Sequence, residues 1–467
     1  MTTIEDWRAH IARIEHLAKA LGLNYHPVEF ELVPESFMTE IAIYGLPVRM
    51  PHWSFGVRYI YQLIQHRMGL SRLFEVVFPG NPGRAYLART NSSAENVLVT
   101  AHVLGHADFS ANNILFKRSQ SQVGEHIVEQ AAAHARQIAM AIQEHGLERV
   151  ESVLDAALSL EQHIDNDLAL RRARYEDIVS DAPLDMSQDE FAKRFASLGP
   201  DTARPQKDAH PKRAPIPPHP EKDLLWFIAQ YAPELEPWER DIFLAVREES
   251  FYFYPVFACQ IMNEGWASYW HARLLREADF LPQEAYLDAV KCHSDVVRPT
   301  ASGDNVSLNT NPYHLGFSIW EKLVDKNGLE FARRTMEADD DFSFVRNHLT
   351  AELASELKLF RYKGQNNGSY LVQEVDLPAL HEALLAPKYG FGAPSVSVQR
   401  VHLDGRLELI HDHVTDGRGL DPERARRVLE YIVRVWRRPV AINTVDNEKR
   451  AVEITIAPNT QLELTRR

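Results

Sequence analysis

The chain has 467 residues, a formal net charge of −14, 45% hydrophobic residues and 25% charged residues. This length allows two or three domains, and the composition is ordinary for a globular protein. The acidic balance excludes a general nucleic-acid-binding protein, which needs a basic surface. No run has the length of a membrane span, the N-terminus lacks the apolar core of a signal peptide, and two cysteines are too few for a disulfide framework. We therefore expect a cytoplasmic protein without a nucleic-acid partner; its oligomeric state stays open.

The first part of the chain is expected to form helices around one β-hairpin. Apolar residues recur at helical spacing over residues 4–21, and residues 32–44 and 55–68 are predicted as two further helices. Two short apolar runs flank the sequence Pro-Gly-Asn-Pro-Gly at 79–83, which predicts a hairpin. A helix over residues 95–116 follows, and it carries the first candidate functional residues.

Two histidines, His102 and His106, lie four residues apart in this predicted helix. Their side chains therefore project from the same face, and two imidazoles in this arrangement can bind one metal ion, as in the HExxH motif. The residue after the first histidine is Val103 rather than glutamate, so the usual general base is missing. Asp108 lies two residues beyond the pair and points to another side of the helix, where it suits an indirect role.

The middle of the chain is predicted to be helical on both sides of a proline-rich stretch. Residues 123–146 and 148–175 are expected to be helical, and the prolines at about 200–223 indicate an exposed linker or surface loop. Within the apolar helix that follows, Glu248 and Glu249 interrupt the pattern. One of them is expected to face inwards, either paired with an arginine or acting as a metal ligand or general base, and both interpretations stay open.

A second stretch, Asn-Glu-Gly-Trp-Ala-Ser-Tyr-Trp-His, complements the histidine pair. Glu264 and His271 are seven residues apart and share a helix face. A carboxylate presented to the pair gives two nitrogens and one oxygen, the open ligand set of a catalytic zinc ion. The sequence thus predicts a divalent metal site formed by His102, His106 and Glu264, with Zn²⁺ preferred, and iron or manganese as alternatives because the same set forms a facial triad.

The remaining elements complete a mainly α fold. Helices are predicted over residues 282–297 and 313–327, and His314 at the start of the second is interpreted as a metal ligand, an oxyanion donor or a buried histidine. After residue 360 the pattern changes to period two, with strands around one amphipathic helix. We therefore expect a large helical domain with a small β-hairpin over residues 1–360, followed by a small α+β domain over 361–467.

Four motifs in this order resemble one known family. They are HVLGHADFxxNN from His102, REExxYF from Arg247, NEGWASYWH from Asn263 and NPYHLG from Asn311. Together they resemble the SpoVR family, the stage V sporulation protein R group, over nearly the whole chain. The resemblance implies a role in sporulation and in forming the spore cortex, a peptidoglycan layer. It also implies two partners, a serine protein kinase and a von Willebrand-type protein, which are encoded beside relatives in many bacteria.

The leading hypothesis is a metal-dependent hydrolase of peptidase or amidase type, similar in its motif order to gluzincin peptidases. Another residue must then replace the missing base, and the candidates for catalytic roles are Glu248, Glu249, His271 and His314. Residues expected to orient the ligands or to bind substrate are Asp108, Asn112, Asn113, Asn263 and Tyr313. The alternative is a non-catalytic, peptidase-like scaffold or regulator acting with a serine protein kinase system, so whether the chain is an enzyme stays open.

Overall fold

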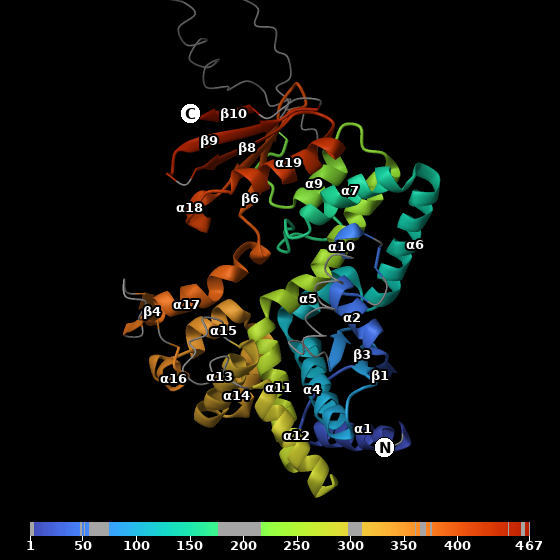
Figure 1. Cartoon of the computed structure of the whole chain (residues 1–467), viewed down its shortest axis with the longest axis vertical. Helices are drawn as coiled ribbons and strands as arrows, with labels where there is room; N and C mark the ends of the chain where they lie inside the picture. The colour runs from blue at the N-terminus through green and yellow to red at the C-terminus, as the bar shows by residue number, and fades with distance from the viewer. Residues whose placement is uncertain are drawn as a thin grey trace, which may run out of the picture. The chain divides into compact units, whose positions relative to one another are not determined.

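Two units make up the described part of the chain, shown in Figure 1. One contains Met1–Arg171 and Leu235–Pro394, and the other contains Arg172–Glu234 and Ser395–Arg467. The second unit thus draws on two separate stretches, whereas the sequence suggested one boundary near residue 360. The computed structural model describes residues 4–46, 49–50, 52–55, 74–175, 216–297, 311–359, 361–364, 370–373, 376–446, 448–458 and 463–466. Most of the predicted helix at 55–68, most of the proline-rich stretch and the loop at 298–310 lie outside these residues.

Helices dominate the first unit, which confirms the predicted mainly α fold. Its helices are α1 (Ile4–Ala20), α2 (Glu35–Tyr44), α4 (Ser93–Asn112), α5 (Ile114–Val123), α6 (Ile127–His145), α7 (Leu147–Ser159), α10 (Pro237–Ala258), α11 (Gln260–Glu277), α12 (Gln283–Val296), α13 (Pro312–Asn327), α14 (Leu329–Ala338), α15 (Asp341–His348), α16 (Ala351–Glu356), α17 (Leu377–Leu385) and the 3-10 helix η1 (Ala386–Gly392). None of the helices in the described residues is long and apolar enough to cross a membrane.

A three-stranded sheet of order β1-β3-β2 lies beside these helices. The predicted hairpin is confirmed, because β2 (Glu75–Phe78) pairs antiparallel with β3 (Gly83–Ala88). The predicted start of the second helix at residue 32 is wrong. Residues 28–33 instead form β1 (Val28–Val33), which pairs in parallel with β3. The alternating sequence Val-Glu-Phe-Glu-Leu-Val suits a strand, but its partner lies about fifty residues later in the chain.

Two other predicted helices end earlier than expected. The helix predicted over residues 95–116 is two helices, because Asn113 leaves the helical conformation, and its side chain accepts a hydrogen bond from Leu115 N at the start of α5. The helix predicted over residues 148–175 is also wrong beyond Ser159. There the chain enters turns, in one of which Asp165 Oδ1 accepts a hydrogen bond from Asp167 N. Short polar side chains that bond to nearby backbone commonly interrupt helices, as Asn113 does between α4 and α5.

The second unit contains the predicted α+β region. Its sheet has the order β10-β9-β8-β7-β6, in which β7 and β8 are parallel and are connected through α19. Leu429, Ile432 and Trp436 give α19 a buried face, and the helix packs on β8 and β9. The elements of this unit are α9 (Leu224–Tyr231), β6 (Val396–Val401), β7 (Leu407–His411), α18 (His413–Asp416), α19 (Pro422–Trp436), β8 (Val440–Val445), β9 (Ala451–Ile456) and β10 (Glu463–Arg466). A two-stranded sheet of β4 (Arg361–Gly364) and β5 (Tyr370–Gln373) belongs to the first unit.

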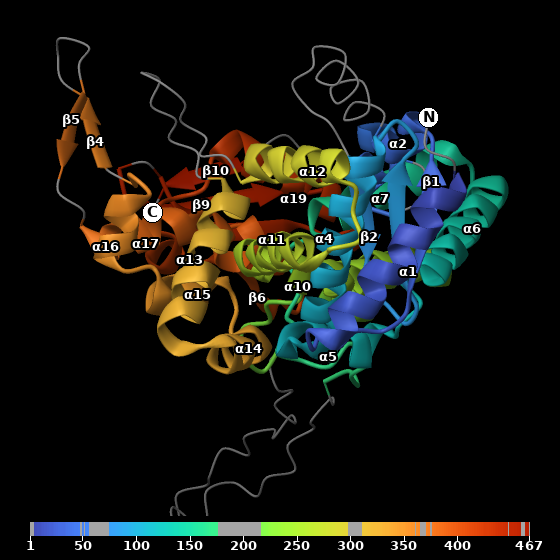
Figure 2. The same cartoon turned by 90° about the horizontal axis from the view of Figure 1, so that it is seen from below.

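Three helices at the centre of the first unit approach one another closely. Figure 2 shows α11 between α4 and α13. The contacts of α11 with α4 and of α11 with α13 are the most extensive between helices in the described chain. Glycines permit this approach: a Cβ added at Gly105 would lie 2.6 Å from the Cα of Ala267, and one at Gly265 would lie 2.3 Å from the carbonyl carbon of Gly316. Both distances are far below van der Waals contact. Gly105 precedes His106 and Gly265 follows Glu264, so the close packing occurs where the predicted ligands lie.

Gly105→Ala is expected to destabilise the protein, because the added methyl group would overlap the backbone of α11. Overpacking of this kind costs about 1–3 kcal/mol in free energy of unfolding. Chemical denaturation would measure the change. Gly83→Ala is the matched control, since a Cβ there meets no atom closer than 3.7 Å. Equal stability of the two variants would contradict the close approach of α4 and α11.

Candidate metal centre

The first ligand helix, α4, begins and ends at polar side chains and is buried between them. Ser92 accepts a hydrogen bond from Glu95 N, and Glu95 accepts one from Ser92 N, forming a capping box. Residues on every face of α4 are buried, as expected for a helix in the middle of a core. This burial holds His102, which is 2% exposed, in a fixed position.

The two predicted stretches meet in space, which the sequence alone left open. His102 Nε2 and His106 Nε2 face each other at 3.0 Å. Glu264 Oε2, from α11, lies 3.5 Å from the first nitrogen and 3.4 Å from the second. Ligand atoms about 2.0–2.2 Å from a shared ion are separated from one another by about 3.0–3.5 Å. The three atoms therefore have the separations that a single divalent ion requires.

The electrostatics of these residues also suit a bound cation. Burial disfavours the charged form of Glu264, but the neighbouring imidazoles of His106 and His102 outweigh it and hold its pKa well below the usual range. Burial likewise opposes a charge on His106, yet the Glu264 carboxylate raises the pKa of that imidazole. Glu264 Oε2 has no hydrogen-bond donor in the described structure. A partly buried carboxylate oxygen without a donor, facing two imidazole nitrogens, fits a metal ion.

The outer nitrogens of both histidines have partners. His106 Nδ1 donates to Asn263 Oδ1 at 2.9 Å, and His102 Nδ1 lies 3.0 Å from His271 Nδ1. Such partners fix the orientation of a ligating ring. The structure thus brings Asn263 and His271, two of the residues singled out in the sequence, to the ligands. Because Nδ1 of His271 faces a ligand's outer nitrogen, its ring supports His102 and does not face the triad.

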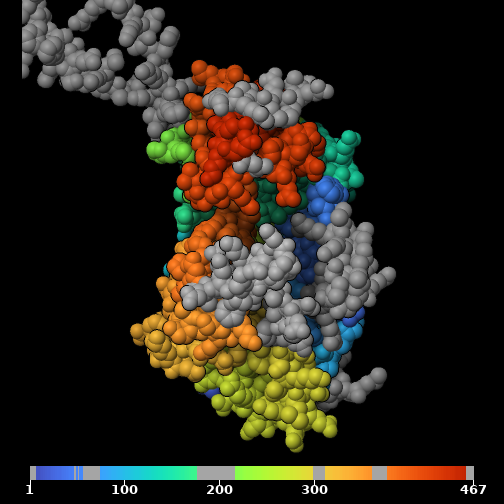
Figure 3. Space-filling view, turned by 60° about the vertical axis from the view of Figure 1, so that its left-hand side comes forward, coloured from blue at the N-terminus to red at the C-terminus, as the bar shows by residue number. Residues whose placement is uncertain are grey.

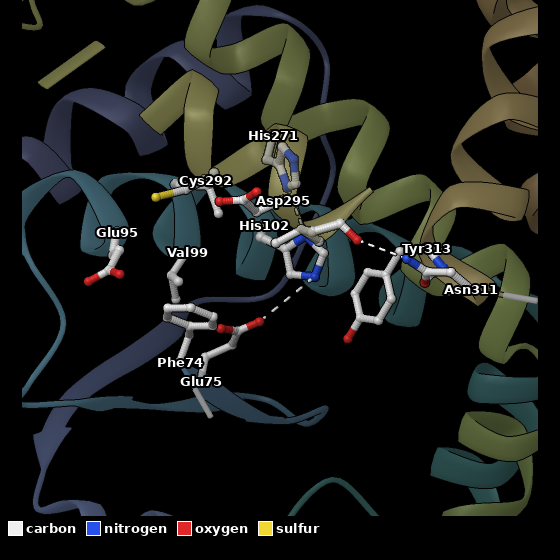
Figure 4. Close-up of a pocket in the computed structure, with 12 residues that line it drawn as sticks. Phe74, Glu75, Glu95, Val99, His102, His271, Cys292, Asp295, Asn311 and Tyr313 are labelled. Carbon is white, nitrogen blue, oxygen red and sulfur yellow. Dashed lines mark hydrogen bonds and ion pairs between the residues drawn. The ribbon is translucent and has the colours of Figure 1, made fainter. Parts of the chain in front are cut away.

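A cavity of about 440 Å³ adjoins the ligand His102, which forms part of its wall. Figure 4 shows Glu75 and Tyr313 at its wall on one side of His102, with His271 and Asp295 on the other. Glu75 Oε1, from β2, lies 3.9 Å from His102 Nε2. Sequence reasoning missed Glu75, since a lone glutamate in a short strand carries no motif; only its place in the predicted hairpin before α4 could have pointed to it.

Two side chains in the cavity have raised pKa values. Burial raises the pKa of Glu75, and the carboxylate of Glu264 adds to this effect, while His102 and His106 oppose it. The negative charge of Glu264 and then burial raise the pKa of Tyr313 well above its usual range. At neutral pH, Tyr313 is therefore a hydrogen-bond donor, and Glu75 is a stronger base than an exposed carboxylate.

The two glutamates of the REE motif lie elsewhere in the unit. Glu249 is fully buried and accepts a hydrogen bond from Arg49 Nε at 2.7 Å, while its other oxygen lies 3.3 Å from His134 Nδ1. Glu248 lies 3.8 Å from the same ring. Within the described residues, no hydrogen bond or ion pair joins either glutamate to the metal ligands. The arginine partner weighed in the sequence analysis exists, and for Glu249 it is Arg49.

The asparagines and Asp108 join neighbouring segments to α4. Asp108 is fully buried and accepts hydrogen bonds from Asn24 N at 2.7 Å and from Trp266 Nε1 at 2.9 Å. Asn112 Nδ2 donates to Asn24 O, and Asn113 Nδ2 donates to Met336 O. All three therefore fix the position of the ligand helix through backbone or buried contacts, and the cavity lining does not include them.

His314 lies on α13 one position after Tyr313. It is half-buried and forms a hydrogen bond with the backbone of Val297. Burial lowers its pKa despite this bond. Since consecutive helical residues point about 100° apart, Tyr313 lines the cavity and His314 does not.

The fold and the site together define a mainly helical protein with a candidate His/His/Glu metal centre. Sequence comparison then identifies the family to which the chain belongs. The SpoVR-like protein family matches residues 1–385, so the chain belongs to the SpoVR family. It is 26% identical over 495 residues to the uncharacterized protein YcgB of Escherichia coli (strain K12), covering 96% of this chain and 94% of that relative. No solved structure is significantly similar to the chain.

Proposed function

We propose that the protein is a metal-dependent hydrolase that cleaves an amide bond. The convergence of His102 Nε2, His106 Nε2 and Glu264 Oε2 beside a cavity carries this proposal. A divalent ion held by these atoms would polarise a substrate carbonyl and activate water, with zinc as the first choice. The mixed nitrogen and oxygen set also accepts iron or manganese.

Glu75 is proposed as the general base that Val103 does not supply. Val103 is fully buried in the hydrophobic core, whereas Glu75 borders the cavity beside His102. In the proposed reaction, a water oxygen attacks the carbonyl carbon and Glu75 accepts the released proton. Glu75 then donates this proton to the amide nitrogen as the carbon–nitrogen bond breaks. One water is consumed, and a carboxylic acid and an amine are formed.

Tyr313 is proposed to stabilise the negative charge that develops on the substrate oxygen. Its hydroxyl stays protonated because of the charge of Glu264 and burial, and it forms a hydrogen bond with the Glu264 carboxylate. In the proposed reaction it donates to the substrate oxygen in place of that carboxylate. His102 and the Tyr313 ring stack with centroids 6.1 Å apart, which places the phenol beside a ligand. His271 and Asn263 hold the imidazoles, and in this proposal neither transfers a proton to substrate.

Metal analysis combined with a hydrolysis assay tests the proposal. Protein purified without an affinity tag for metals would be loaded with zinc, iron or manganese and incubated with a peptide and amide library, with mass spectrometry as the readout. We expect about one ion per chain and cleavage that chelation abolishes. Metal binding without cleavage of any library member would overturn the hydrolase proposal and favour a scaffold acting with a serine protein kinase system, the alternative that the absent HExxH glutamate suggests.

A further inference from the structure

A row of four histidine rings crosses the candidate metal centre. It begins at the ligand His106, continues through His102 and His271, and ends at His293 of α12. His271 Nε2 lies 2.6 Å from His293 Nδ1, and its ring is completely buried. His293 is half-buried on a helix that Figure 3 shows in yellow at the surface. Neither the proposed chemistry nor any motif of the sequence uses His293.

The ligand role of His102 fixes the direction of every hydrogen bond in this row. His102 presents Nε2 to the metal, so its proton must be on Nδ1, from which it donates to His271 Nδ1. A neutral His271 that accepts at Nδ1 carries its proton on Nε2. That N–H is directed at His293 Nδ1, which must then be an acceptor. One tautomer per ring satisfies all of these contacts.

We propose that His271 and His293 are positioning residues that fix the tautomer of the ligand His102. A buried imidazole can exchange its proton between two nitrogens, and only one of these tautomers of His271 can accept from His102. His293 selects that tautomer by accepting the Nε2 proton. The inference rests on the metal centre of the proposed function but not on hydrolysis.

His271 lies between two other imidazole rings. It is completely buried, and each of its nitrogens is directed at one of them, Nδ1 at His102 and Nε2 at His293. Ligating histidines usually donate to a carboxylate or a carbonyl, whereas the acceptor here is a neutral ring. The row therefore orients His102 without adding negative charge near the ion. Phe317 contacts the His293 ring edge-on, with centroids 5.3 Å apart, and holds it against α13.

Two substitutions of His293 distinguish the effect of its acceptor nitrogen from the effect of its ring volume. His293→Phe keeps a planar ring but removes the acceptor, and His293→Asn places an oxygen close to the position of Nδ1. Zinc affinity would be measured by competition with a chelator. We expect the dissociation constant to rise about 10- to 100-fold in His293→Phe, and to stay close to that of wild type in His293→Asn. His126→Phe is the control, because His126 is exposed.

Nitrogen-15 NMR of the zinc-loaded protein provides a readout that lost packing alone would not change. We expect His102 protonated on Nδ1 and His271 on Nε2 in wild type and in His293→Asn, and mixed tautomers of His271 in His293→Phe. Zinc affinity in His293→Phe equal to wild type, or His271 protonated on Nδ1, would overturn this inference alone. Wild-type protein that binds no zinc, iron or manganese would overturn the metal centre and the proposed function as well.

Discussion

Replacing His106 with alanine is expected to remove the bound metal ion from an otherwise folded protein. His106 supplies one of three protein ligands, and the two that remain, His102 and Glu264, cannot hold the ion tightly. The ring is only 11% exposed, so its removal also leaves a cavity, and the fold of the variant must be measured beside its metal content. Metal content should fall from about one equivalent to near zero, as measured by mass spectrometry, and amide hydrolysis should fall with it. Glu264→Gln should give the same result, because it removes the carboxylate charge and keeps the shape.

His126→Ala is the matched control for this experiment. It also removes one histidine, but from an exposed position at the start of α6. It should therefore keep full metal content, which shows that loss is specific to the centre. Circular dichroism of each variant would establish that the helices remain. A folded His106→Ala protein that still holds one tightly bound ion would show that the ligand set is wrong.

Glu75→Gln is expected to abolish most hydrolysis while leaving the ion in place. Loss of a positioned general base lowers the rate by about 10²–10⁴. Glu75 lies 3.9 Å from His102 Nε2 and is not one of the three closely spaced ligand residues, so metal content should stay near wild type. The measurement is kcat for a substrate found in the library assay, together with metal analysis of the same sample.

Glu31→Gln serves as the control for Glu75→Gln. Glu31 is exposed on β1 of the same three-stranded sheet, so this variant tests whether any loss of carboxylate charge on the sheet lowers the rate. We expect it to behave as wild type. Wild-type kcat in Glu75→Gln would exclude Glu75 as the base. Loss of the ion in that variant would instead make Glu75 a fourth ligand.

The helices and the central ligand set could be predicted because they depend on local patterns. Apolar residues at helical spacing located α1, and the Pro-Gly-Asn-Pro-Gly turn located the pair β2 and β3. The four-residue spacing of His102 and His106 gives a shared helix face whatever the tertiary structure. Glu264 could be predicted as the third ligand because the apolar residues around it indicate a buried helix. Such a helix can present a carboxylate to the face that carries the two histidines.

The rest depends on contacts between distant parts of the chain, which one sequence does not reveal. Glu75 reaches the ligands because β2 packs near α4, and His293 reaches His271 because α12 packs against α4 and α11. Arg49, the partner of Glu249, is two hundred residues away from it in sequence. Likewise, β1 pairs with β3, a strand that lies far from it in the sequence. No local sequence pattern encodes the order of strands in a sheet.

The second unit consists of two separate stretches of the chain, and this limits where the protein can be truncated. Glu221 N donates to Val398 O, and the ring of Phe227 in α9 stacks on Trp436 with centroids 6.2 Å apart. Cutting the chain before Ser395 would therefore deprive the buried apolar residues of α9 of their partners. Expressing only the residues after Pro394 would remove the segment that pairs with β6. A version that keeps the metal centre alone must omit both stretches, Arg172–Glu234 and Ser395–Arg467, and rejoin the chain at α10.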